Sequence, residues 1–137
     1  MQTGVECGGS APVFAFNGRY LLLALLVFAV ELIIAMGLSH VAWVRAYLGD
    51  VLVVVLLYTA ARSVLCISDR VLLWAVFLFA CLVELAQYFG MAERLGFVRG
   101  DVMYTVIGNT FSWGDIACYA GGCVLVAGVK AAHRRLR

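Results

Sequence analysis

Four long apolar segments constrain this chain more than any other feature. They cover residues 19–38, 47–66, 71–90 and 111–131. A helix of about 20 apolar residues crosses the hydrocarbon core of a bilayer. The sequence is 65% hydrophobic and only 13% charged, whereas soluble domains average about 45–50% and 25%. We therefore predict an all-α fold, an integral membrane four-helix bundle.

The segments define a simple domain organisation. Residues 1–18 are expected to form a flexible N-terminal tail, residues 19–131 a single four-span transmembrane domain, and residues 132–137 a basic C-terminal tail. The basic tail would anchor the chain at the membrane surface and contact anionic lipids. In the glycine-rich fourth segment, Gly114, Cys118 and Gly122 follow an i, i+4, i+8 spacing that allows close helix packing.

The distribution of Lys and Arg predicts the orientation, because cytoplasmic loops carry an excess of both residues. One side would hold Arg19, Arg62, Arg70, Lys130, Arg134, Arg135 and Arg137. The other side would hold Arg45, Arg94 and Arg99. Both the N and C termini are therefore expected in the cytoplasm, with the first and third loops facing outward.

Four carboxylates are expected at a similar depth in the membrane. Successive helices alternate in direction, so Glu31, Asp50, Glu84 and Asp115 all fall in the outer half of the bundle. Glu31 and Glu84 would lie roughly 10 Å from the outer ends of their helices, at 1.5 Å per residue. No carboxylate is expected within the cytoplasmic half.

A charged carboxylate near the bilayer centre costs about 2.5–3.5 kcal/mol, so such groups face the bundle interior and take partners. Gln87 and Tyr88 follow Glu84 on one helix face, and Arg45 and Arg99 are the expected cationic partners. The predicted binding residues are Glu31, Arg45, Asp50, Glu84, Gln87, Tyr88, Arg99 and Asp115. Two interpretations stay open, namely a functional pocket and a polar cluster that only fixes helix order.

The third loop, residues 91–110, is the longest outer connection. Loops of this length are often lids or binding loops. Arg94, Arg99 and Asp101 are placed to close over the carboxylates. The apolar stretch "VMYTVI" within the loop would lie along the membrane interface or re-enter the membrane.

Other functional classes find little support in the composition. The net charge of +2 does not indicate nucleic-acid binding, since the basic residues are scattered or lie at the C-terminus. The five cysteines show no metal-ligand spacing, and the four in apolar stretches are expected to pack as small hydrophobic residues. We expect no cofactor and no metal, although carboxylate oxygens would suit Mg²⁺ or Ca²⁺.

Three stretches together carry a resemblance to a known family: "RAYLGDVLVVVLLYTAAR", "ELAQYF" and "FSWGDIACYAGG". They resemble the bacterial membrane-protein family catalogued as domain of unknown function 2809, which is similar to the VanZ-like proteins. The VanZ-like pattern has a Glu-x-x-Gln on one helix, then an Arg, then an Asp that opens the last helix. Glu84, Gln87, Arg99 and Asp115 match it, whereas Ser112 stands where the family usually has an acid.

The resemblance implies a multi-pass protein of the bacterial cytoplasmic (inner) membrane that works in the cell envelope. We expect it to bind or modulate an envelope lipid, glycan or glycopeptide, with membrane lipids and a protein partner or a second copy as further partners. The alternative is an intramembrane enzyme acting on a lipid-linked substrate, with Glu84 or Asp115 as catalytic acid or base and Arg45 or Arg99 holding a phosphate. A transporter fits least, because it would need carboxylates on both sides of the midplane.

Overall fold

The computed structural model describes residues 12–37, 40–101, 103–104 and 110–137, and they form a helical bundle. Four helical segments are long and apolar enough to cross a membrane: α1 (Gly18–Gly37), Val44–Val64, α3 (Asp69–Tyr88) and α6 (Trp113–Arg135). The second segment joins a π-helical turn, η1 (Val44–Leu48), to α2 (Gly49–Val64). No β-strand occurs among the described residues. The all-α class with four candidate spans is thus confirmed.

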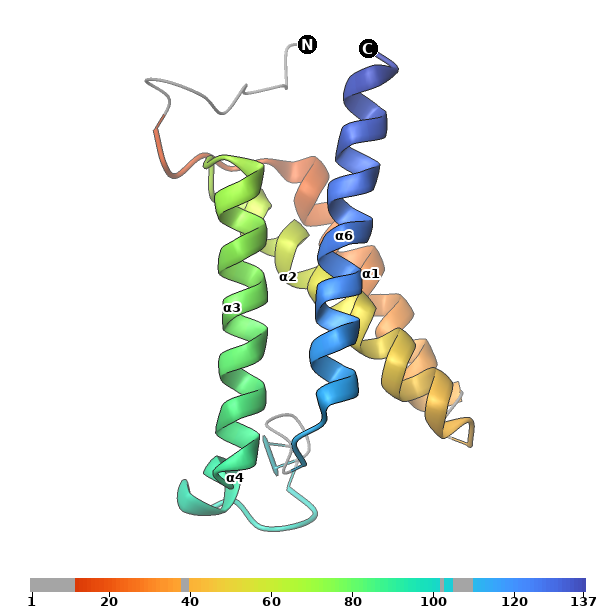
Figure 1. The fold of residues 1–137 in the computed structure, drawn as a ribbon, viewed down its shortest axis with the longest axis vertical. Coiled ribbons are helices and arrows are strands. Elements are labelled where there is room, and N and C mark those ends of the chain that lie inside the picture. The colour runs from red at the N-terminus through yellow and green to blue at the C-terminus, as the bar shows by residue number, and fades with distance from the viewer. Residues whose placement is uncertain (1–11, 38–39, 102, 105–109) are drawn as a thin grey trace.

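Successive spans run in opposite directions, and α1 and α2 cross α3 and α6 at an angle (Figure 1). The start of α1, the end of α2, the start of α3 and the end of α6 lie together, and we call this the basic end. The opposite end is called the carboxylate end. The α2 helix is central, because it packs against α1, α3 and α6, whereas α1 packs mainly against α2.

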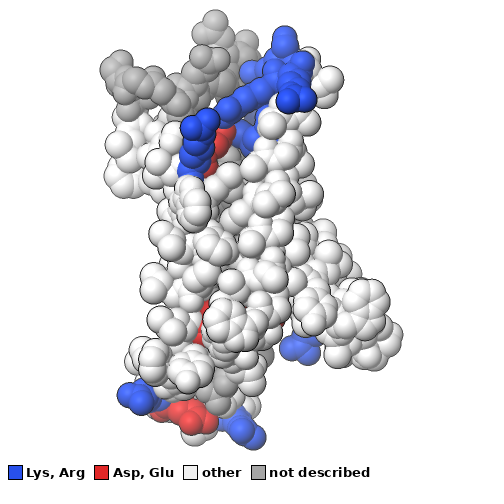
Figure 2. Space-filling view, viewed as in Figure 1, with Lys and Arg blue, Asp and Glu red and all other residues white. Residues whose placement is uncertain are grey.

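The core lies where α2, α3 and α6 meet. Val54, Leu72, Val76 and Tyr119 are among its buried side chains. Gly122 allows α6 to approach α2, since a Cβ at this position would lie 2.9 Å from the Cβ of Val54. Figure 2 shows an outer surface that is mostly uncharged between two charged ends. This pattern matches a bundle whose sides face lipid and whose ends face water.

The described part of the predicted tail is held by backbone hydrogen bonds. Residues 13–17 run alongside residues 63–66, where Phe14 and Leu65 form an isolated antiparallel bridge. The bonds run from Ala15 N to Val64 O (3.0 Å), from Asn17 N to Ser63 O (2.7 Å) and from Cys66 N to Val13 O (2.7 Å). Residues 13–17 are therefore attached to the end of α2 and the residues that follow it.

The cysteines are of two kinds. Cys81, Cys118 and Cys123, on the spanning helices, are free and partly buried. Cys66, which follows α2, is disulfide-bonded. Its expected role as a packed thiol is therefore wrong.

The third loop begins with a short turn of helix, α4 (Met91–Arg94). Gly90, Gly96 and Gly100 adopt positive φ angles of 62°, 87° and 107°, a conformation that glycine adopts without steric cost. The backbone N–H of Val98 donates to Asp101 Oδ2 over 3.0 Å. The stretch "VMYTVI", predicted to lie along the membrane interface or to re-enter the membrane, falls mostly outside the described residues.

Candidate functional site

Three carboxylates gather at the carboxylate end of the bundle. Glu84 lies four residues before the end of α3, Asp50 is the second residue of α2, and Asp115 is the third residue of α6. The antiparallel arrangement of these helices brings the three positions to one level. The alternating helix directions expected from the sequence predict the same shared depth for these three carboxylates.

Glu84 is fully buried, with 0% of its surface exposed. Its Oε1 accepts a 2.7 Å hydrogen bond from the backbone N–H of Ser112. Its Oε2 accepts a 3.3 Å hydrogen bond from the hydroxyl of Tyr119. Ser112 is the N-cap residue of α6, where backbone N–H groups lack partners within the helix. Glu84 therefore fastens the start of α6 to α3.

Asp50, Glu84 and Asp115 lie close enough to one another to interact electrostatically. Asp115 lies in the first turn of α6. Asp50 Oδ2 is buried without a hydrogen-bond partner.

Local packing brings α2 and α6 together at this site. The ring of Tyr47, in η1, covers Gly114, and a Cβ on Gly114 would lie 3.3 Å from Tyr47 Cε1. A larger residue at position 114 would push η1 away from the first turn of α6. The π-helical turn itself ends two residues before Asp50, and such turns are frequent at functional sites.

Tyr119 belongs to the site, although it is not among the residues predicted from the sequence. Its side chain is buried, and its hydroxyl donates to Glu84 and also interacts with Asp50 and Asp115. The available signal was its i+4 spacing from Asp115, which places both residues on one face of α6. Tyrosine is common enough in membrane helices that this spacing alone did not identify it.

The two other α3 residues of the predicted site, Gln87 and Tyr88, differ in how far they are buried. Gln87 is half-buried and lies one turn beyond Glu84, on the same face. Tyr88 is 65% exposed and points toward the surface. Its ring makes edge-to-face contacts with Phe89 and Phe111, which places it among aromatic residues typical of a membrane interface.

Glu31, Arg45 and Arg99 do not join the three carboxylates. Glu31 is partly buried on α1, and its Oε1 has no hydrogen-bond partner. Arg45 and Arg99 are exposed, and neither forms an ion pair with a described residue. The expected pairing of these arginines with the carboxylates is therefore wrong. The described part of the site holds acids without a cationic partner.

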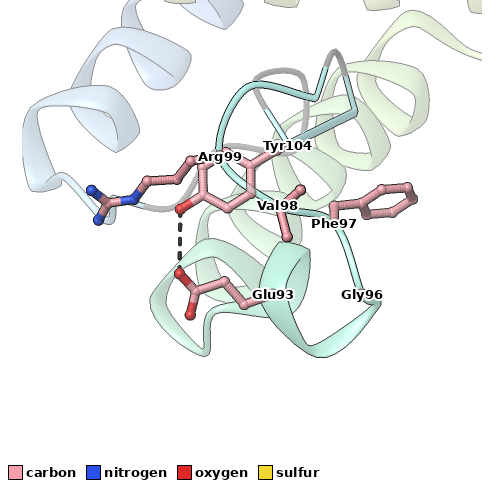
Figure 3. A pocket seen from close by; sticks show the side chains of 6 residues that line it. All are labelled: Glu93, Gly96, Phe97, Val98, Arg99 and Tyr104. Atoms are coloured by element: carbon pink, nitrogen blue, oxygen red, sulfur yellow. Dashed lines mark hydrogen bonds between the residues drawn. The ribbon is translucent and has the colours of Figure 1, made fainter.

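Arg99 instead lines a cavity of about 380 Å³ within the third loop, together with Glu93, Gly96, Phe97, Val98 and Tyr104. Figure 3 shows its guanidinium pointing away from the hydrogen bond between Tyr104 and Glu93, which measures 3.4 Å. Neither this cavity nor a second one at the basic end is lined by Asp50, Glu84 or Asp115.

A further carboxylate lies at the basic end, where the sequence analysis expected none within the membrane. Asp69 is the first residue of α3, and only 12% of its side chain is exposed. The hydroxyl of Tyr58 donates to it over 2.7 Å, and Arg62 lies 3.6 Å away. The i+4 spacing of Tyr58 and Arg62 on α2 was the sequence signal for this cluster.

Within the described ranges, no group of three or more His, Cys, Asp or Glu side chains could hold a metal ion. The described side chains of the site are carboxyl groups and one tyrosine hydroxyl. These groups accept hydrogen bonds, attract cations and exchange protons.

Comparison with known proteins gives one match. The family described as "Protein of unknown function (DUF2809)" matches residues 39–123. This range contains Asp50, Glu84, Asp115 and Tyr119, and it excludes Glu31. No curated protein and no solved structure matches the chain.

Proposed function

The chain belongs to the DUF2809 family, whose match covers more than half of it, and we propose that it binds a bacterial cell-envelope lipid or glycan. The proposed site is formed by Asp50 and Asp115, positioned by Glu84 and Tyr119. The protein would act in the cytoplasmic membrane, with the carboxylate end facing outward. It is a small protein with four candidate membrane spans.

The observation that carries this proposal is the absence of a cationic partner for Asp50 and Asp115 among the described residues. Glu84 has both oxygens occupied and serves as a structural link between α3 and α6. Asp50, by contrast, keeps a buried oxygen with no partner. Unpaired polar groups in a membrane are costly and commonly mark ligand pathways.

The chemistry of the site favours a ligand that donates hydrogen bonds. Sugar hydroxyls and the amine of a lipid headgroup or glycopeptide are such donors. An amine would also supply the missing positive charge, and charge-assisted hydrogen bonds are roughly twice as strong as neutral ones. Envelope lipids and glycans present both kinds of group at the outer surface.

Native mass spectrometry of the protein purified in mild detergent tests the proposal. We expect an envelope lipid or glycan to co-purify with the wild type and to be lost in Asp50→Asn and Asp115→Asn. Glu31→Gln is the matched control, because it removes a membrane carboxylate that does not interact with the site. Equal retention by all variants would overturn the proposal, provided that their unfolding temperatures agree.

A second candidate function is acid–base catalysis on a lipid-linked envelope substrate. It is favoured by the closeness of Asp50 and Asp115, since two neighbouring carboxyl groups can serve as the acid and the base of one reaction. Under this alternative, overexpressing the wild type but not Asp115→Asn would change the lipid-linked intermediates extracted from membranes. Recovery of the ligand chemically unchanged from both proteins would favour binding alone.

A further inference from the structure

A second cavity, at the basic end, has the composition of an anion site. It occupies about 500 Å³ between the start of α3 and the last turns of α6. Its lining comprises Ser68, Asp69, Arg70, Leu73, Ala127, Lys130, Ala131 and Arg134. Three of these side chains are cationic and one is acidic. Figure 2 shows a group of Lys and Arg side chains at this end of the molecule, with others at the opposite end.

Asp69 is shared among several groups and cannot neutralise them all. Arg134 lies 2.7 Å from its carboxylate, Lys130 lies 3.5 Å away and Arg62 lies 3.6 Å away. Arg62 and Lys130 are largely buried, with 12% and 25% of their side chains exposed. Cations that are buried without full compensation favour the binding of an anion.

Arg70 adds a further positive charge to the cavity. It is exposed and forms no ion pair with any residue that the structure describes. Lys130 and Arg134 are four residues apart on α6 and therefore lie on one helix face. The hydroxyl of Ser68 at the start of α3 adds a hydrogen-bonding group to the same cavity.

The cavity is amphipathic as well as basic. Its lining also includes the apolar residues Leu73, Ala127 and Ala131, which belong to the candidate membrane spans α3 and α6. An anionic group bound by the arginines would thus have an apolar surface directly beneath it. Basic cavities between membrane helices commonly bind anionic lipid headgroups in this way.

We propose that this cavity binds the phosphate of an anionic phospholipid, whose acyl chains follow the apolar wall. Arg70, Lys130 and Arg134 would contact the phosphate oxygens, and Ser68 would donate to them. The proposal is independent of the function assigned to the carboxylate end. It does not depend on the orientation of the protein either.

The test uses the full chain, delipidated in detergent and titrated with phosphatidylglycerol or phosphatidylcholine while native mass spectrometry counts bound lipid. We expect phosphatidylglycerol to bind more tightly than phosphatidylcholine. Arg70→Gln should weaken phosphatidylglycerol binding by about fivefold, the effect of one basic residue at a membrane surface. Arg134→Gln should weaken it at least as much.

Arg135→Gln is the matched control, because Arg135 is the neighbour of Arg134 on α6 but does not line the cavity. It should bind phosphatidylglycerol like the wild type. Equal losses in Arg134→Gln and Arg135→Gln, or no loss in Arg70→Gln, would overturn the proposal. Arg70 has no structural partner among the described residues, so its variant is expected to fold.

A parallel titration with inorganic phosphate separates a lipid from a free phosphate compound. We expect millimolar phosphate to leave bound phosphatidylglycerol in place, because phosphate lacks the acyl chains that contact Leu73 and Ala127. Complete displacement of the lipid would overturn the lipid assignment in favour of a soluble phosphorylated ligand.

Discussion

Glu84 stood out in the sequence because a carboxylate interrupts an otherwise apolar helix. The structure gives it two hydrogen-bond donors from the start of α6, the backbone N–H of Ser112 and the hydroxyl of Tyr119. Removing the carboxylate would leave both donors buried and unpaired. A buried group left without its partner costs about 1–3 kcal/mol.

We therefore predict that Glu84→Ala lowers the free energy of unfolding by about 3 kcal/mol, because two buried donors lose their acceptor. Glu84→Gln should cost less, since its amide oxygen can still accept from Ser112. Tyr119→Phe, which removes one hydroxyl, should cost about 1 kcal/mol. Denaturant unfolding in detergent micelles measures all three, and equal losses in Glu84→Ala and Glu84→Gln would contradict the assignment.

Asp69 holds the cations of the basic end together. Asp69→Asn would leave Arg62 and Lys130 without their carboxylate, and we predict a loss of about 3 kcal/mol. This is the lower end of the range for breaking a buried ion pair, because one of the three cations, Arg134, is exposed to solvent. Thermal unfolding in detergent measures the loss.

A second variant checks the cause of the Asp69 effect. If uncompensated positive charge destabilises Asp69→Asn, then Asp69→Asn/Lys130→Gln should be more stable than Asp69→Asn alone. A double variant that is less stable than both single variants would instead indicate that lost packing, and not uncompensated charge, causes the destabilisation.

Some of this residue-level arrangement could be predicted from the sequence and some could not. The common level of Asp50, Glu84 and Asp115 follows from alternating helix directions, which the apolar segments determine. Which way a side chain points depends on helix packing, so Glu31 and Tyr88 were assigned to the site although they lie apart from it. Asp69 was missed because the predicted helix started two residues too late.

The positions of the helices could be predicted from the length of the apolar segments, whereas the contacts between helices depend on small residues. The approach of α6 to α2 depends on Gly122, where a Cβ would meet Val54 Cβ at 2.9 Å and Val51 O at 3.1 Å. Gly121, its neighbour, has open space around the same position. The spacing of Gly114, Cys118 and Gly122 predicted close packing, and the contacts at Gly114 and Gly122 confirm it.

This difference predicts opposite effects for adjacent substitutions. Alanine gains about 1 kcal/mol over glycine in a helix interior, so Gly121→Ala should be neutral or slightly stabilising. Gly122→Ala gains the same helix propensity, but its methyl group would push α6 away from α2. Such overpacking costs about 1–3 kcal/mol. Unfolding temperatures that are lower for Gly122→Ala than for Gly121→Ala would support the packing, and equal temperatures would contradict it.

At the scale of the whole molecule, two features favour opposite orientations. Seven Lys and Arg residues lie at the basic end or in its tail, against Arg45, Arg94 and Arg99 at the other end. This excess favours a cytoplasmic basic end. The disulfide at Cys66 favours the reverse, because disulfides persist in oxidising compartments.

We predict that the charge distribution decides, because Lys and Arg near the ends of spans set the orientation during insertion. A green fluorescent protein fused after Arg137, which fluoresces only if it stays in the cytoplasm, should be bright in bacteria. The control fusion after Gly100, in the third loop, should be dark. The reverse pattern would place the Cys66 disulfide outside the cytoplasm and turn the carboxylate end inward.

The pairing of residues 13–17 with residues 63–66 also bears on how the protein is made. Residues 13–17 are synthesised before α1, whereas residues 63–66 are synthesised only at the end of α2. The early segment has no partner until both helices have left the ribosome and entered the membrane as a hairpin. Residues 13–17 can therefore form these hydrogen bonds only after α1 and α2 have been inserted.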